Sequence, residues 1–349
     1  MVACGHNLIA IVAVASAAGL KAALKARNIS GTIKVIGSPA EEGGGGKVIL
    51  LNEGAYDGID ACVMAHPEGG VPGVDEDGSA YTSGPATLAR AGFSVELFGK
   101  AAHAGAAPWL GVNALDAAVQ GYTAVSMLRQ QLEPTMRVHG ILDYGKEKWV
   151  QNIIPAYAKV EYSTRAMDVK STLDLRKKVI ACFESAAAAT GCTHKVSTPE
   201  TEVYADLRNN VTLADAYADF MTTAFGQKIG RVGMSTASTD FGNVTYKMPA
   251  IHPGFHLISK GVNHTPEFTD AAGTHDAHVR AIKVAKGLAM LGAKFLQDDK
   301  FAKEVKRKFE DFKREVGELK LTDDRNEVRE VNGVVKQRNI AEQVDEIWL

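Results

Sequence analysis

The sequence is poor in cysteine, carries almost no net charge and has no long uninterrupted run of strongly apolar residues. Its 349 residues include four cysteines, Cys4, Cys62, Cys182 and Cys192, whose spacing shows no regular disulfide framework. In a chain of this size, cysteines without such a framework are typically reduced thiols. We therefore predict that the protein resides in a reducing compartment, the cytoplasm. The formal net charge of −2 gives no reason to expect a nucleic-acid partner.

The stretch from Leu8 to Leu20 is the one place where a secretion signal comes into question. Ala15-Ser16-Ala17 within it resembles a signal-peptidase cleavage site. No Lys or Arg precedes the stretch, however, and Asn7 fits the N-cap of a helix. We therefore favour a buried helix over a signal peptide, and we expect no membrane-spanning segment and no membrane partner.

The first 87 residues alternate between helical and strand patterns. We predict a helix over 8–27, a strand over 32–37, a helix over 47–53 and a strand over 60–65 that leads into His66. This order is typical of an α/β fold, a mostly parallel sheet covered by helices, and ligands of such sheets collect at the carboxyl ends of the strands. Glu41, Glu42 and His66 fall at such ends.

A different order begins near residue 88. The patterns predict a strand over 93–98, a helix over 112–131, strands over 135–144 and 157–167, a helix over 171–189 and a strand over 193–198. This βαββαβ order predicts an inserted ferredoxin-like domain over 88–202. Residues 1–87 and 203–297 then form one domain, with a helix from 207 to 225, a strand over 250–258 and a last helix over 274–296. Residues 298–349 read as a charged helical tail.

Taken singly, the polar residues at these positions have ordinary explanations. Cys4-Gly5-His6 is compatible with a turn beside a buried thiol, the Glu41-Glu42 pair with two exposed acids, and His66 with a satisfied core histidine. The glycine run after Glu42 suggests a phosphate-binding loop, but Glu41 stands where that motif requires glycine. Val48 also follows Lys47 where the motif requires Ser or Thr, so a nucleotide-binding protein is disfavoured.

Taken together, the same residues indicate a metal site. Thiolate, imidazole and carboxylate are the ligand types that divalent transition metals accept. The Glu41-Glu42 doublet also suits a division of labour, in which one carboxylate binds metal and its neighbour takes a proton from water.

Three sequence strings carry a resemblance to a known family. They are Ala3-Cys4-Gly5-His6-Asn7, Pro39-Ala40-Glu41-Glu42-Gly43-Gly44 and Met64-Ala65-His66-Pro67. From residue 1 to about residue 297 the chain resembles the dimetal aminoacylase-type peptidases, peptidase family M20. The Cys-Gly-His variant is similar to the subgroup of p-aminobenzoyl-glutamate hydrolases, auxin-conjugate amidohydrolases and β-alanyl-lysine dipeptidase-like proteins, and is most similar to the last of these.

The resemblance implies a role for each matching residue. Five would hold two divalent ions, zinc or alternatively manganese, and Glu41 would be the general base and then the proton donor to the leaving amine. On the inserted domain, His103 would stabilise the oxyanion in the partner subunit of a homodimer, while Asn152 and Arg165 would hold the substrate carboxylate. The five implied metal ligands are Cys4, His6, Glu42, His66 and His264. Arg165 is also compatible with a plain surface ion pair.

The implied activity is hydrolysis of an amide bond next to a free carboxylate, in a dipeptide or an N-acyl amino acid. The sequence departs from the family pattern in one respect, because relatives carry a substantial segment before the Cys-Gly-His motif. The alternative hypothesis is therefore a catalytically silent, truncated form that dimerises with a full-length relative through the inserted domain. The spacing of Asp240 and His252 does not decide whether either of them is a further ligand.

Overall fold

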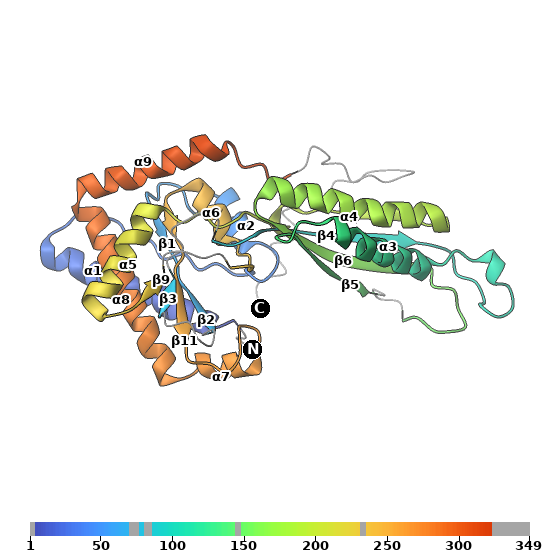
Figure 1. Cartoon of the computed structure of the whole chain (residues 1–349), viewed down its shortest axis with the longest axis horizontal. Helices are drawn as coiled ribbons and strands as arrows, with labels where there is room; N and C mark the ends of the chain where they lie inside the picture. Colours follow the sequence, from blue (N-terminus) through green and yellow to red (C-terminus); the bar gives the residue numbers. More distant parts are fainter. Residues whose placement is uncertain (1–3, 70–76, 80–85, 144–147, 231–234, 323–349) are drawn as a thin grey trace. The chain divides into compact units, whose positions relative to one another are not determined.

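The computed structural model describes residues 4–69, 77–79, 86–143, 148–230 and 235–322. Within these ranges the chain divides into two compact units (Figure 1). The first unit contains the described residues up to Arg90, a short stretch at Ala166–Lys170, and Thr201 to Leu321. The second unit contains Ala91–Arg165 and Ser171–Glu200.

The first unit joins short, mainly parallel strands to helices. Strand β1 (Cys62–Val63) pairs in parallel with β10 (Ala250–Ile251), and β2 (His66–Gly69) pairs in parallel with β11 (Gly254–Leu257). β3 (Gly78–Ser79) lies antiparallel to β11 and parallel to β9 (Ile229–Gly230). The expectation of a mixed α/β fold with mostly parallel pairing is thus met in this unit.

Seven helices of the first unit are described around these strands. They are α1 (His6–Arg27), α2 (Gly46–Asn52), α5 (Val211–Phe225), α6 (Phe241–Lys247), α7 (Pro266–Ala272), α8 (His275–Gln297) and α9 (Asp299–Val316). The predicted helix over 207–225 begins later, because the Asn210 side chain caps α5 by accepting from the Leu213 amide. The short strand β8 (Val203–Tyr204) begins two residues after the chain returns from the second unit at Thr201.

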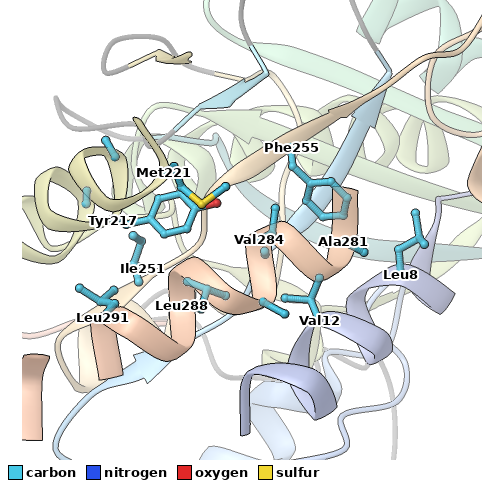
Figure 2. Packing of buried hydrophobic residues seen from close by; sticks show 14 of the residues in the cluster. Leu8, Val12, Tyr217, Met221, Ile251, Phe255, Ala281, Val284, Leu288 and Leu291 are labelled. Atoms are coloured by element: carbon cyan, nitrogen blue, oxygen red, sulfur yellow. The ribbon is translucent and has the colours of Figure 1, made fainter. Parts of the chain in front are cut away.

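The core of the first unit lies between α1, α5, α8 and the strands. Figure 2 shows Leu8 and Val12 of α1 against Ala281 of α8, in a cluster that continues to Tyr217 of α5 and Ile251 of β10. Apolar burial of this kind is the main stabilising term of such a fold. It fixes the start of α1 beside β2, which brings the Cys4-Gly5-His6 string next to His66.

Helix α1 differs from the sequence expectation in two ways. Its N-cap is Gly5, and Asn7 instead donates a side-chain hydrogen bond to the Ala272 carbonyl at 3.0 Å. By length and composition α1 is also long and apolar enough to cross a membrane, so the expectation that no segment meets this criterion is wrong. The core helix of a folded domain and a signal sequence pass the same test, and 22% of the apolar window of α1 is buried, with Leu8, Val12 and Leu24 among its buried residues.

The predicted strand over 32–37 is wrong as well. Residues 29–40 form no helix or strand, and Val35 is 53% exposed. The β-branched residues suit a strand, but a strand forms only when its backbone groups find a neighbouring strand. Among the described strands none pairs with this segment.

The second unit has the predicted βαββαβ order. Its elements are β4 (Ala89–Phe98), α3 (Ala114–Leu128), β5 (Arg137–Asp143), β6 (Tyr157–Ala166), α4 (Val169–Thr190) and β7 (Thr193–Ser197), and its sheet order is β5-β6-β4-β7. Alternate residues of β4 and β6 are buried with the inner faces of α3 and α4, as one-sided packing of a sheet requires. The helices approach closely, since a Cβ at Gly121 would lie 2.2 Å from the Phe183 ring.

The described part of the tail contains the helix α9, which packs on other elements of the first unit. Asn210 donates to the Val305 carbonyl at 2.9 Å, and the Phe312 ring lies 5.1 Å from that of Tyr246. The predicted tail beyond residue 322 lies outside the described residues.

Candidate functional site

The two carboxylates of the site stand on a tight loop, residues 39–46, that leads into α2. Gly45 is the N-cap of α2 with a φ of 60°, and a Cβ on Gly46 would lie 1.8 Å from the Pro39 carbonyl oxygen. Only glycine fits where two backbone segments approach so closely. The loop also contains Ala40 at a φ of 56°, a conformation that costs a non-glycine residue energy and needs support from its surroundings.

Cys4 and His6 are placed by a turn at the start of α1. Gly5 adopts a φ of 77°, and a Cβ there would lie 2.6 Å from the Pro67 ring. This turn sets Cys4 beside β2, with its Sγ atom 3.5 Å from the Nε2 atom of His66. His6 reaches the loop, where its Nε2 atom lies 3.8 Å from a Glu41 oxygen and 3.6 Å from a Glu42 oxygen.

His66 is oriented by its own neighbour in the chain. Its Nδ1 atom lies 2.7 Å from the Pro67 carbonyl oxygen, which makes Nδ1 the protonated nitrogen and leaves Nε2 as a free acceptor facing Cys4. A histidine that binds a metal through one nitrogen commonly donates from the other to a carbonyl. The geometry around His66 is therefore that of a ligand.

His264 completes the group from the segment before α7. Its Nε2 atom lies 3.6 Å from a Glu42 oxygen, and its backbone has a φ of 71°. The preceding residue, Asn263, donates to the Pro67 carbonyl at 3.0 Å and also contacts the Cys4 sulfur at 3.6 Å. Asn263 thus ties the His264 segment to Cys4 and β2, a role that its place beside His264 in the sequence could have suggested.

The five predicted ligands, together with the predicted general base Glu41, form three overlapping groups that could each hold a metal ion. These are Cys4, His6 and His66; Cys4, Glu42 and His264; and His6, Glu41 and Glu42. Within each group the candidate ligand atoms lie within 4.8 Å of one another. The buried His6 Nε2 atom has no hydrogen-bond partner among the described residues, as expected for a nitrogen that awaits an ion. The donor set therefore fits divalent metal ions with mixed thiolate, imidazole and carboxylate ligands.

Burial shifts the ionisation of these groups. It raises the pKa of the Cys4 thiol to about 12, with the Glu42 charge adding to the effect, so binding an ion requires release of the thiol proton. Burial also lowers the pKa of His6 and of His66, which favours the neutral imidazole that a metal requires. The pKa of Glu41 is raised by burial, against the opposing hydrogen bond from Thr239 and the charge of Lys47. A carboxylate with a raised pKa is suited to general acid–base catalysis.

A buried ion pair lies under the carboxylate loop. The Lys47 ammonium lies 2.8 Å from one oxygen of Asp240, and the Lys47 amide donates to the other oxygen at 2.8 Å. Asp240 is fully buried and holds the start of α2 through both of its oxygens. It belongs to none of the candidate metal groups among the described residues. His252 is also buried, and its ring lies 6.0 Å from that of His66 in a stacked orientation. Neither contact is indicated by any spacing in the sequence.

Three predicted site residues belong to the second unit. His103 is exposed, and its Nδ1 atom accepts from the amides of Gly105 and Ala106 at 3.2 and 3.1 Å. The neutral ring therefore carries its proton on Nε2, which faces away from its own loop as a donor. Asn152 is exposed, and its backbone carbonyl accepts from the Ala104 amide at 2.9 Å, which places it beside the His103 loop. Arg165 is half-buried near the end of β6.

Comparison with known proteins decides the family. The sequence profile described as "Peptidase family M20/M25/M40" matches residues 1–295. The chain belongs to this family. The resemblance seen in the Cys-Gly-His, Glu-Glu and His-Pro strings is thereby confirmed. The glycine-rich loop of this M20 chain uses the amides of Gly44 and Gly45 for internal hydrogen bonds, which leaves the phosphate-loop alternative without support.

This M20 chain is similar to two named dipeptidases over most of its length. It is 44% identical over 298 residues to the Xaa-Arg dipeptidase of Mus musculus, covering 82% of this chain and 65% of that protein. It is 40% identical to the Xaa-Arg dipeptidase of Homo sapiens, covering 82% of this chain and 64% of that protein. The chain thus spans a little under two thirds of the length of these relatives.

A solved structure supports the fold. The chain is similar, with a TM-score of 0.57 and 22% identity, to a Bacillus subtilis protein described as a dinuclear metal-binding peptidase of the M20 family. The match covers 84% of this chain and 74% of that one. At this identity the likeness establishes the shared fold.

Proposed function

We propose that the chain is a metal-dependent amidohydrolase that cleaves an amide or peptide bond next to a free carboxylate, in a dipeptide or an N-acyl amino acid. One observation carries the proposal. His6 Nε2 lies within 3.8 Å of oxygens from both Glu41 and Glu42, and the remaining donors Cys4, His66 and His264 belong to candidate metal groups that overlap with this one. A pair of carboxylates beside soft and imidazole donors suits hydrolysis assisted by metal ions.

The names of the similar proteins support this substrate class. The mouse and human relatives, at 44% and 40% identity, are called Xaa-Arg dipeptidases. A dipeptide with a C-terminal arginine combines a single peptide bond with an adjacent carboxylate, so we propose such dipeptides as the first substrates to test. Because the named relatives are enzymes, the alternative of a catalytically silent form has no support from them.

The proposed roles divide between ligands and a proton carrier. Cys4, His6, Glu42, His66 and His264 would hold two divalent ions, zinc or alternatively manganese. Such ions, when bound, polarise a substrate carbonyl and lower the pKa of water. Glu41, with its raised pKa, takes the proton of the attacking water and returns it to the leaving amine.

The second unit supplies the proposed substrate contacts. The Nε2–H group of His103, fixed by the two amides on Nδ1, is a donor suited to the negative charge that develops on the attacked carbonyl oxygen. Asn152 and Arg165 would hold the substrate carboxylate, for which a guanidinium offers two parallel donors.

We also propose that two copies pair through the second unit, so that His103 of one copy serves the site of the other. Support comes from β5, which lies at the edge of its sheet and exposes 61% of Ile141. The outer face of α3 is apolar too, with Tyr122 53% and Met127 66% exposed. An apolar sheet edge favours pairing with another strand. The substitution Ile141→Lys is expected to convert a dimer to a monomer in light scattering.

The proposed compartment is cytoplasmic. The four cysteines are all unpaired, as expected of reduced thiols.

The substitution Glu41→Gln tests the mechanism. We expect it to lower kcat on an Xaa-Arg dipeptide by about 10²-fold to about 10⁴-fold, while the metal content stays that of the unmodified chain. Glu53→Gln, a change of an exposed acid on the α2 cap, is the matched control and is expected to retain full activity. Undiminished turnover by the Glu41→Gln variant would show that the proton carrier is another group.

A further inference from the structure

The carboxylate loop 39–46 is seated on the segment 201–204, through which the chain returns from the second unit to the first. The backbones of the loop and of this segment approach closely, because a Cβ on Gly45 would lie 1.9 Å from the Thr201 carbonyl oxygen. Two side chains of this segment, those of Glu202 and Tyr204, hydrogen-bond to the backbone of the loop. Neither residue is among the metal-ligand groups.

Tyr204 holds the loop at two points with a single hydroxyl group. The hydroxyl donates to the backbone carbonyl of Glu41 at 2.9 Å and accepts from the Gly45 amide at 3.1 Å. Tyr204 itself is buried, with 2% of its surface exposed. A buried hydroxyl that both donates and accepts in this way fixes the spacing between Glu41 and Gly45.

Glu202 adds a third attachment. One of its oxygens accepts from the Gly44 amide at 2.9 Å, and the other lies 3.0 Å from the guanidinium of Arg90. Arg90 also lies over the Tyr204 ring, 5.0 Å from its centre, in a cation–π arrangement. Arg90 is the last residue of the first unit before the chain enters the second. Residues next to the first and the last crossing between the units therefore both support the loop.

The loop needs such support for a physical reason. Ala40, immediately before Glu41, has a left-handed φ of 56°, and a strained backbone of this kind persists only when its surroundings fix it. Glu41 and Glu42 must also be presented to different partners from adjacent positions. An error of about 1 Å in such a group can lower a rate by about 100-fold.

We infer that Tyr204 and Glu202 are positioning residues, which hold the Glu41 and Glu42 backbone in the conformation that hydrolysis requires. The inference rests on the proposed function for its kinetic consequence, but the attachment of the loop can be measured independently. The two residues would raise kcat through the loop without touching substrate.

Tyr204→Phe tests the inference because it removes only the hydroxyl. Tyr217→Phe is the matched control, since Tyr217 is equally buried and no described residue hydrogen-bonds to its hydroxyl. We expect hydrogen exchange at the amides of the loop to accelerate by about 3-fold to about 10-fold in Tyr204→Phe, as loss of a hydrogen bond predicts. In the Tyr204→Phe variant, peptides from α8 should exchange at the rate of the unmodified chain. In the Tyr217→Phe variant, all peptides should do so.

Kinetics supply the second measurement. In Tyr204→Phe we expect kcat to fall by about 10-fold, with KM, metal content and the fraction of folded protein at the assay temperature close to those of Tyr217→Phe. Glu202→Ala should behave like Tyr204→Phe, and Glu202→Gln should restore most of the activity because its amide oxygen still accepts from Gly44.

The outcomes separate the inference from the proposed function. Loop exchange and kcat that match Tyr217→Phe would overturn the inference, and so would a loss of kcat that only parallels a loss of folded protein. If the unmodified chain cleaves none of the dipeptides, the proposed function fails. Loop exchange that is nevertheless faster only in Tyr204→Phe would still support the attachment of the loop by Tyr204.

Discussion

The Cys4 sulfur lies 3.5 Å from Nε2 of His66, although 62 positions separate the two residues in the chain. The turn at Gly5 and the start of β2 bring them together, and the other proposed ligands arrive from the loop before α2 and the segment before α7. No short peptide contains this site. Metal binding should therefore be coupled to the folding of the first unit.

Metal uptake should strengthen as the pH rises. In the metal-free chain the Cys4 pKa is raised to about 12, so the thiol is protonated near neutrality and must lose a proton when it binds an ion. His6 and His66 have lowered pKa values and are already neutral there. We expect the apparent affinity to rise by about 10-fold per pH unit between about pH 6.5 and about pH 8.5.

Calorimetry in buffers of different ionisation enthalpy measures the released proton. Cys4→Ser should release about one proton fewer and bind at least about 10-fold more weakly. Cys182→Ser, on α4 of the second unit, is the control. An affinity independent of pH in the unmodified chain would remove Cys4 from the ligand set.

The stability of the metal-free chain should fall in acid. Burial, followed by the charge of His66, lowers the pKa of His252 to about 3, whereas an unfolded histidine titrates near 6.5. Between these values the unfolded chain binds more protons than the folded chain. The contribution of neutral His252 to the free energy of unfolding is therefore fully present above about pH 6.5, and it declines by up to about 1.4 kcal/mol per pH unit below that pH.

Denaturant titrations at several pH values test this dependence. His252→Leu should show a shallower decline than the unmodified chain, and His278→Gln, which alters an exposed residue of α8, should not. Equal slopes in the His252→Leu and unmodified chains would contradict the assignment.

The buried pair of Lys47 and Asp240 should be critical for stability. Asp240→Asn leaves the Lys47 ammonium buried without its partner, so we expect the free energy of unfolding to fall by about 3 to about 5 kcal/mol. The exposed pair of Lys306 and Asp60 offers a control, because Asp60→Asn should cost less than about 1 kcal/mol. Similar losses for the two substitutions in chemical unfolding would show that Lys47 finds another partner.

Much of the fold could be predicted from the sequence, and the reasons lie in local patterns. The alternation along β4 and the spacing along α3 and α4 specify which face of each is buried. The prediction of a strand over 32–37 was wrong because the residue pattern is local, whereas a strand also needs a partner strand from elsewhere in the chain. The prediction of Asn7 as the N-cap of α1 was wrong because the Asn7 side chain donates to the Ala272 carbonyl instead. Local sequence patterns do not predict this long-range contact.

The candidate site divides in the same way. Cys4, His6, Glu42, His66 and His264 were recognisable from short strings, and the structure brings these five together. The contacts of Lys47 with Asp240 and of Tyr204 with Glu41 were not predictable, since they join residues more than 150 positions apart. These residues belong to no recognisable motif, so only the fold shows which groups they contact.

The metal content of the purified chain tests the central claim most directly. After dialysis against a weak chelator, elemental analysis is expected to find about two divalent ions per chain, and clearly fewer in a variant that carries both His6→Ala and Glu42→Ala. This loss should accompany loss of Xaa-Arg dipeptide hydrolysis. A folded, unmodified chain that retains almost no divalent metal, or that hydrolyses dipeptides equally well without it, would contradict the account.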